Sequence, residues 1–175
     1  MAERNFIPFP ILTTERLTLK QLSVDDDKQI FALRSNPAIN KYLDRQACKT
    51  IEDARVFITQ ILENTKRNDS LYWAIALTKS KSFVGTICLF DFSTEDNKCE
   101  IGFELLTTFQ GQGIMKEAIA KVIDNAFQQM YFQKIEAFTH KENQSSIKLL
   151  ENVNFKKSST ADKENTDYII FNLTN

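Results

Sequence analysis

The segment CEIGFELLTTFQGQGIMKEAIAKVIDNAFQQM, residues 99–130, decides the fold class. Its first eight residues predict a strand, and residues 114–130 carry apolar side chains at the spacing of a helix. The turn between them contains Gly111 and Gly113, two of only four glycines in the chain. A strand that enters a helix through such a turn points backbone N–H groups outward at the positive end of the helix dipole. The segment therefore predicts a turn suited to a phosphate or pyrophosphate.

Glycine turns between a strand and a helix also occur in other kinds of loop. An ordinary strand-to-helix turn that needs positive φ is one alternative. The phosphate loop of nucleoside triphosphatases is excluded because no Gly-Lys-Ser/Thr sequence follows, and a dinucleotide fingerprint fails because its third glycine would fall on Lys116. In the helix itself, Glu117 and Lys121 are four residues apart, and we expect them to pair on its outer side.

Outward from this segment, the periodicity predicts an α/β fold. Strands at 71–77, 83–90 and 99–106 are joined by short links, which is typical of an antiparallel meander. Asn36-Pro37 is expected to stop the first helix, and no internal repeat or linker is visible. The length of 175 residues fits a single domain, residues 1–175. The remaining predicted elements are strands at 16–22, 134–140, 155–157 and 167–173 and helices at 25–35, 51–66 and 143–151.

Composition argues against several classes of protein. With 22 basic and 23 acidic residues, the chain lacks the basic surface expected of a nucleic-acid binder. No apolar run approaches the roughly 20 residues of a membrane span, and Glu3 and Arg4 interrupt any signal peptide, so we expect a cytoplasmic protein without a membrane partner. Three cysteines without CxxC spacing and the single His140 predict no metal site. Cys88 and Cys99 are expected to be small core residues.

The turn also carries a resemblance to a known family. Residues 110–115, QGQGIM, resemble the Gln/Arg-x-x-Gly-x-Gly/Ala pyrophosphate loop of the GNAT N-acetyltransferases, which bind acetyl-coenzyme A. Residues 14–19, TERLTL, are similar to the first strand of the branch that includes the ribosomal-protein N-terminal (alanine/serine) acetyltransferases. Residues 83–87, 100–103 and 143–155 resemble further motifs of that branch. The resemblance implies a GNAT-like mixed, mostly antiparallel central sheet with helices on both faces.

Two positions depart from the family pattern. Met115 occupies the usual Gly/Ala position of the loop, where its side chain either crowds the phosphates or points to the core. Asn154 replaces the usual glycine before Phe155, and asparagine tolerates the left-handed backbone better than most residues. The resemblance therefore implies acetyl-CoA binding more firmly than turnover.

The same resemblance implies which residues bind the cosubstrate. The backbone N–H of Leu105 would hydrogen-bond pantetheine and serve as the oxyanion donor. Asn143 would bind the pantetheine arm, with capping of its own helix as the competing role. The residues implied for acetyl-CoA are Leu105, Gln110, Gly111, Gln112, Gly113, Ile114, Met115 and Asn143.

The candidate catalytic residues lie on both sides of the loop. Glu100 and Glu104 share one strand face with Gly102 between them, and Glu104, nearest the loop, is the predicted base. A solvated or salt-bridged carboxylate is the alternative for Glu104, while Glu100 and His140 remain further candidates for the base. Ser146, one turn after Asn143, is predicted to lie near the departing sulfur. Many relatives outside this branch place a tyrosine where this chain has Leu150, so a phenolic acid is excluded at that site.

The resemblance implies acetyl transfer to a primary amine by direct attack in a ternary complex. The amine would belong to a protein N-terminus or a small molecule, and a homodimer stays open. The N-terminal helices and residues 41–49 are expected to select the acceptor. The alternatives are a catalytically silent acyl-CoA-binding sensor or scaffold of the same fold and a nucleotide-binding regulator.

Overall fold

The computed structural model describes residues 5–160 and 164–175. Within these residues, eight strands form one sheet in the order β1-β2-β3-β4-β5-β6-β8-β7. All neighbouring strands are antiparallel except β5 and β6, which are parallel. The strands are β1 (Leu12–Thr13), β2 (Leu17–Gln21), β3 (Leu71–Leu77), β4 (Phe83–Ser93), β5 (Lys98–Leu105), β6 (Lys134–His140), β7 (Lys156–Lys157) and β8 (Tyr168–Thr174).

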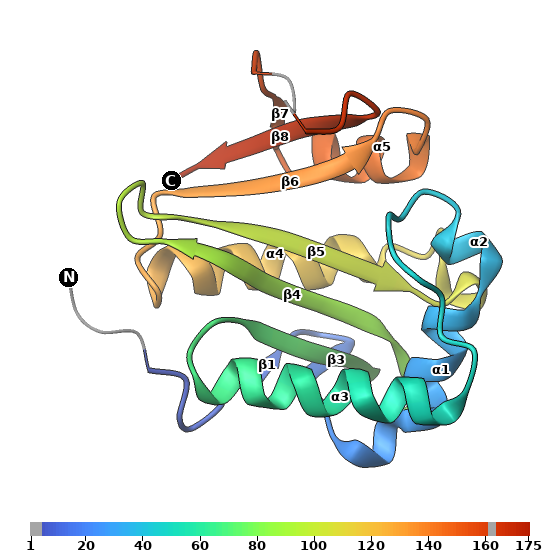
Figure 1. Cartoon of the computed structure of the whole chain (residues 1–175). Coiled ribbons are helices and arrows are strands. Elements are labelled where there is room, and N and C mark those ends of the chain that lie inside the picture. The colour runs from blue at the N-terminus through green and yellow to red at the C-terminus, as the bar shows by residue number, and fades with distance from the viewer. Residues whose placement is uncertain (1–4, 161–163) are drawn as a thin grey trace.

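Helices cover both faces of this sheet, as Figure 1 shows. The helices α1 and α3 lie on the viewer's side, and α4 and α5 lie behind the sheet. The mixed, mostly antiparallel sheet with helices on both faces confirms the predicted fold class. The helices are α1 (Asp27–Ser35), α2 (Pro37–Asn40), α3 (Ile51–Lys66), α4 (Ile114–Gln128) and α5 (Gln144–Asn152), with short 3-10 helices η1 (Val24–Asp26) and η2 (Thr107–Phe109).

Strand alternation divides the apolar side chains between two cores. Trp73 packs in the larger core, which includes the buried face of α4. Its neighbour Tyr72 points to the opposite face and packs against α1 and α3. On α4, Ala118, Ile119 and Val122 are fully buried. Burial of a side chain as large as Ile119 or Val122 stabilises the fold by about 1.5–3 kcal/mol. Residues that are adjacent in β3 therefore hold different helices onto the sheet.

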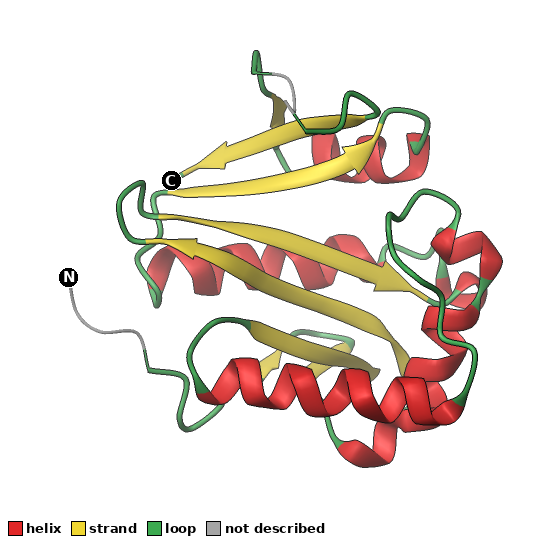
Figure 2. Ribbon diagram, viewed as in Figure 1, coloured by secondary structure: helices red, strands yellow, loops and turns green. Residues whose placement is uncertain are grey.

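Strands β5 and β6 diverge soon after they begin. Lys98–Glu100 pairs with Lys134–Glu136, whereas β5 pairs with β4 as far as Leu105. Figures 1 and 2 show the two ribbons side by side at one end and well separated where α2 and α5 lie. The last pair places Glu100 beside Glu136, and like charges at paired positions oppose further pairing. The Nζ atoms of Lys98 and Lys134 lie 2.8 Å and 2.5 Å from Glu136 oxygens.

The predicted bounds hold best where the apolar period is long. Strands β3 and β6 have the predicted bounds, while β4 extends to Ser93 and α4 ends earlier, at Gln128. The helix α1 stops at Ser35 as expected, yet the Asn36 side chain accepts hydrogen bonds from the next backbone N–H groups and begins the unpredicted α2. Asn154 adopts a φ of 70°, which confirms a left-handed residue after α5. None of the described helices is long and apolar enough to cross a membrane.

Close backbone approach makes Gly85 a sensitive position of the sheet. A Cβ at this position would lie 2.2 Å from the carbonyl oxygen of Glu104 and 3.0 Å from Cα of Leu105. We expect Gly85→Ala to reduce the free energy of unfolding by about 1–3 kcal/mol, measured by urea denaturation, because β5 must shift. Gly102→Ala is the matched control, since its Cβ would meet the Cys88 sulfur, a side-chain atom, at 3.1 Å. If Gly85→Ala lost no more unfolding free energy than Gly102→Ala, the close backbone approach at Gly85 would not limit the stability of the sheet.

Candidate active site

A cavity of about 1610 Å³ lies where β5 and β6 diverge. Its lining comes from β5, the turn before α4, the end of β6, the start of α5 and the α1–α3 region. A site for one drug-sized ligand typically has about 300–1,000 Å³. The volume therefore accommodates an extended cosubstrate together with a second molecule.

The glycine turn opens into this cavity with its backbone. Gly111 and Gly113 have φ of 74° and 73°, and both line the cavity. Gly113 precedes the first residue of α4, and its carbonyl accepts the hydrogen bond of Glu117 N–H. The N–H groups of residues 114–116 consequently have no partner within the helix. A Cβ at Gly111 would meet nothing within 4 Å, so a ligand has room to approach the chain there.

The far side of the turn is held by residues of the N-terminal TERL segment. Arg16 donates from Nε to Glu117 Oε2 at 2.6 Å and from a terminal nitrogen to the carbonyl of Gln112 at 3.0 Å. The Thr14 hydroxyl donates to Glu117 Oε1 at 2.5 Å. Burial opposes ionisation, but the hydrogen bonds from Thr14 and Arg16 hold the pKa of Glu117 below its ordinary value. The expected pairing of Glu117 with Lys121 is wrong, because Glu117 instead ties α4 to the first strands.

The glutamine side chains of the loop hydrogen-bond to backbone carbonyls of the chain. Gln110 donates from Nε2 to the carbonyl of Leu105 at 3.0 Å, and Gln112 donates likewise to Thr108 at 3.0 Å. Gln112 does not line the cavity. Ile114 and Met115 are buried in the larger core and also line the cavity, so Met115 packs in the core beside the loop. These side chains fix the loop and leave its backbone to contact a ligand.

Lys116, also in the first turn of α4, lines the cavity and brings a cation that the sequence analysis did not single out. Its position after the glycine turn was the available signal.

The backbone N–H of Leu105 faces the space between β5 and β6. The N–H of Leu106 donates to the carbonyl of Val84 at 2.9 Å, and Gly85 lies opposite Leu105 in the register. Because N–H groups alternate between the two edges of a strand, the Leu105 N–H points away from β4. The described pairing of β6 with β5 ends before this position. Leu105 thus offers a donor at the mouth of the divergence.

Glu104 is an ion-paired carboxylate in the cavity wall. Its Oε1 contacts a terminal nitrogen of Arg45, and the Glu104 side chain is 11% exposed. Arg45 in turn donates from Nε to Asn40 Oδ1 at 2.9 Å. Glu100 and Glu104 both line the cavity, as their shared strand face predicted. The salt-bridged state that the sequence left open is the observed one, and Arg45 is a partner that no local pattern revealed.

Two neighbouring groups respond to the Glu104 charge. Burial, reinforced by Glu104, raises the pKa of the Cys88 thiol to about 12. Burial and then Glu104 also raise the pKa of Tyr72 far above its ordinary value, and the Tyr72 hydroxyl donates to Thr86 at 3.0 Å. Cys99 is buried as expected, and Cys88 is half-buried, packs against the smaller core and also lines the cavity. A protonated Cys88 is unsuited to act as a nucleophile.

At the start of α5, Asn143 and Ser146 face the cavity together. Asn143 Oδ1 accepts the backbone N–H of Ser146 at 3.2 Å, so the capping role is present. The Asn143 amide nitrogen and the Ser146 hydroxyl have no hydrogen bond to any described residue and can bind a ligand. Leu150 is 1% exposed and belongs to the core.

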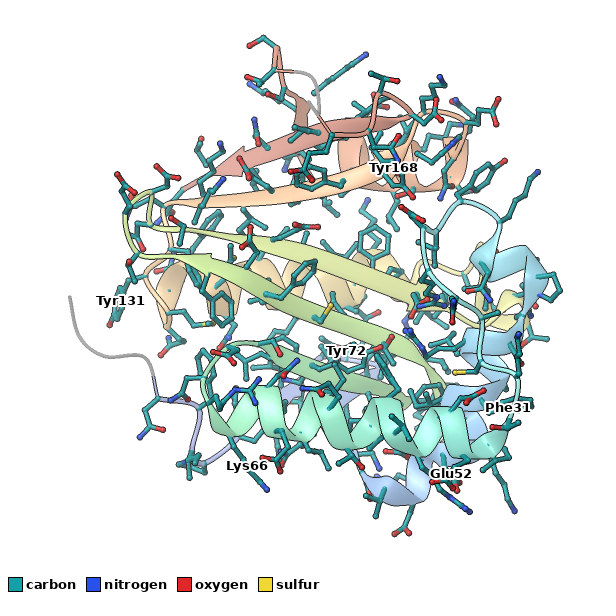
Figure 3. The ribbon with its side chains drawn as sticks, viewed as in Figure 1. Phe31, Glu52, Lys66, Tyr72, Tyr131 and Tyr168 are labelled. Atoms are coloured by element: carbon teal, nitrogen blue, oxygen red, sulfur yellow. The ribbon has the colours of Figure 1, made fainter. Side chains whose placement is uncertain are left out.

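His140 forms part of an aromatic wall. Its ring stacks on Tyr42 at 5.3 Å and meets the Tyr168 ring edge-on at 5.7 Å. Tyr168, labelled at β8 in Figure 3, donates its hydroxyl to the Tyr42 carbonyl at 2.8 Å, which holds the α2–α3 connection against β8. Residues 5–160 and 164–175 contain no cluster of histidine, cysteine and carboxylate side chains suited to a metal ion. Tyr42, His140 and Tyr168 all line the cavity.

Comparisons with known proteins agree with this geometry. The model of the acetyltransferase (GNAT) domain matches residues 16–156. The N-acetyltransferase YoaA of Bacillus subtilis (strain 168) is 30% identical over 149 residues, which cover 85% of this chain and 84% of YoaA. A ribosomal-protein-alanine acetyltransferase of Vibrio fischeri superposes with a TM-score of 0.82 at 21% identity, covering 95% of this chain and 97% of that one.

A further solved structure contains a ligand. RimL, a ribosomal alpha-N-protein acetyltransferase in complex with coenzyme A, superposes with a TM-score of 0.84 at 16% identity, covering 94% of this chain and 98% of that one. The domain match spans more than half of the sequence and includes Arg16 and the glycine turn. The chain belongs to the GNAT acetyltransferase family and is an N-acetyltransferase.

Proposed function

We propose that this enzyme transfers the acetyl group of acetyl-CoA to a primary amine by direct attack in a ternary complex. The observation that carries the proposal is one cavity shared by the glycine turn, the Leu105 N–H and the Glu104 carboxylate. Residues 1–175 would act as a single acetyltransferase domain. A protein N-terminus is one acceptor class, in view of the ribosomal-protein acetyltransferases among the structural neighbours.

In this proposal, acetyl-CoA would lie along one side of the cavity. The unpaired N–H groups at the start of α4, with Gly111 and Gly113, would bind the pyrophosphate, and Lys116 would add a positive charge. The free edge of β5 at Leu105 would bind pantetheine, with Asn143 on the opposite side. Binding by backbone groups suits an anion whose charge is spread over several oxygens.

The reaction needs a neutral amine, an oxyanion donor and stabilisation of the leaving thiolate. The amine lone pair forms the new C–N bond at the thioester carbonyl, and the C–S bond breaks. The Leu105 N–H would donate to the carbonyl oxygen as negative charge develops. Glu104 would take the proton of the amine, directly or through a water, with Arg45 holding the carboxylate in place. Ser146 would donate to the departing sulfur.

A catalytically silent module of the same fold is the alternative, and the missing tyrosine and Met115 favour it. Packing of Met115 in the larger core supports turnover instead. Release of free thiol from acetyl-CoA, measured with a panel of amines, tests the proposed activity. Coenzyme A binding in calorimetry without thiol release for any amine would favour the silent module.

The contact of Arg16 with the glycine turn generates the first prediction for this site. We expect Arg16→Met to raise the Kd for coenzyme A in calorimetry by roughly fivefold to thirtyfold, because loss of a charge-assisted contact frees the turn. The maximal rate should change little at saturating acetyl-CoA. Arg55→Met is the matched control, since Arg55 makes a similar 2.8 Å ion pair with Asp27 away from the cavity. Unchanged affinity in Arg16→Met would remove the positioning role.

The proposed base generates a pH-dependent prediction. An α-amino group has a pKa of about 8, so the neutral amine becomes scarce as the pH falls below that value. We expect Glu104→Gln to lower kcat/KM by roughly tenfold to a hundredfold near neutral or lower pH and much less at about pH 9.5. The pH profile of an α-amino substrate measures this. A pH-independent ratio would argue against proton transfer, and the same profile in Glu100→Gln would identify Glu100 as the base.

The proposed role of the Ser146 hydroxyl is to stabilise the leaving thiolate. If it stabilises the thiolate, Ser146→Ala should reduce the maximal rate by roughly tenfold or more, each tenfold loss being about 1.4 kcal/mol. Coenzyme A affinity should hardly move. Single-turnover kinetics measure the chemical step apart from product release, and Ser145→Ala on the preceding position is the control. Full retention of the single-turnover rate would show that the thiolate leaves without this hydroxyl.

A further inference from the structure

The part of the cavity beneath α1 and α3 has an unusual charge arrangement. We call this part the inner chamber. Its neutral walls combine an aromatic ring of α3 with polar groups of β3 and β4, and two arginines and one glutamate bring charge to it. In Figure 3, Tyr72 marks its position between α3 and the sheet. The residues of the inner chamber are Arg34, Arg45, Phe57, Tyr72, Thr86, Cys88 and Glu104.

Arg34 enters the inner chamber without an anionic partner. Its guanidinium carbon lies 3.8 Å from the centroid of the Phe57 ring, which holds the side chain flat against α3. The Nε atom is buried and has no hydrogen-bond partner, and the side chain makes no ion pair with any described residue. Arg34 as a whole is half-buried, and a cation with a buried donor that lacks a partner is stabilised when an anion pairs with it.

The other two charges of the inner chamber pair with each other. Glu104 is already paired with Arg45. Arg45 is fixed through Asn40, whose side chain also donates to the backbone carbonyl of Arg34 at 2.7 Å. Asn40 therefore contacts both arginines. Arg45 is paired with Glu104, whereas Arg34 has no anionic partner among the described residues.

Arg34 and Glu104 lie close enough to act on the same groups. The charges of both residues perturb the Tyr72 hydroxyl and the Cys88 thiol, in opposite directions. Under the proposed function, Glu104 receives the reacting amine. An anion on Arg34 would then lie on the same small molecule or residue, a few bonds from that amine. A planar guanidinium matches a carboxylate with two parallel hydrogen bonds, and a single cation balances its single charge.

We propose that the acceptor is an amine with a carboxylate a few bonds away, and that Arg34 binds this carboxylate. The inference rests on the proposed acetyl transfer and names the substrate class of that site. Two sources share this chemistry. One is a free amino acid with its own α-carboxylate, and the other is a peptide N-terminus whose first residue has an acidic side chain.

Matched acceptors that differ by one amide test the proposal in the full-length enzyme. Alanine against alaninamide tests the free amino acid, and the amidated tripeptide Asp-Ala-Ala against Asn-Ala-Ala tests the acidic N-terminus. In at least one pair, kcat/KM for thiol release should be roughly tenfold higher for the carboxylate member. Arg34→Met should abolish that preference and keep the rate for the amide member, while Arg34→Lys should restore part of it.

Controls separate this proposal from the proposed function and from misfolding. Coenzyme A affinity measured by calorimetry should be unchanged in Arg34→Met and Arg34→Lys, which shows that the variants fold. If no amine supports thiol release, the proposed transfer fails, and calorimetry of the same four acceptors in the presence of coenzyme A still measures carboxylate binding. Equal kcat/KM or affinity within both pairs, or a preference that survives in Arg34→Met, would overturn the assignment of Arg34.

Discussion

The divergence of β5 from β6 is the constraint on which the rest of the site depends. Strand β5 pairs with β4 along its length but with β6 over three residues only. Buried backbone groups require partners, so the unpaired edge of β5 at Leu105 is a place where an extended ligand can complete the hydrogen bonding of the sheet. Without this divergence, a continuous sheet would fill the cavity and leave no room between the loop and α5.

The divergence must be held open by contacts elsewhere in the chain. On one side, Thr14 and Arg16 fix the first turn of α4 through Glu117. On the other, the hydroxyl of Tyr168 holds the α2–α3 connection through the Tyr42 carbonyl. Both contacts join segments about a hundred residues or more apart in sequence. The cavity therefore depends on tertiary contacts of polar side chains as much as on the apolar cores.

Sequence reasoning succeeded where a local period or a local turn determines structure. The bounds of β3 and β6 and the start of α4 followed from apolar spacing, and the antiparallel meander followed from the short links between its strands. The mixed sheet with helices on both faces was implied by the family resemblance. It failed for α2, because a four-residue helix has no period to detect and depends on the Asn36 cap. The Arg16–Glu117 pair was also missed, since i,i+4 spacing favoured Lys121 and only folding brings Arg16 near.

The two halves of the site differ in the kind of signal they leave in a sequence. In the proposed function, the cosubstrate half uses backbone groups, and Gly111 and Gly113, both with positive φ, give it a short, contiguous pattern. The proposed acceptor half uses side chains of α1, α3, β5 and the α2–α3 connection, which are dispersed between Arg34 and Glu104. The sequence does not reveal which of these charges pair with each other. In the structure, Glu104 pairs with Arg45, and Arg34 has no counterion among the described residues. The proposed acetyl-CoA site could thus be anticipated from the family resemblance of short sequence segments, whereas the proposed acceptor selection requires the three-dimensional arrangement.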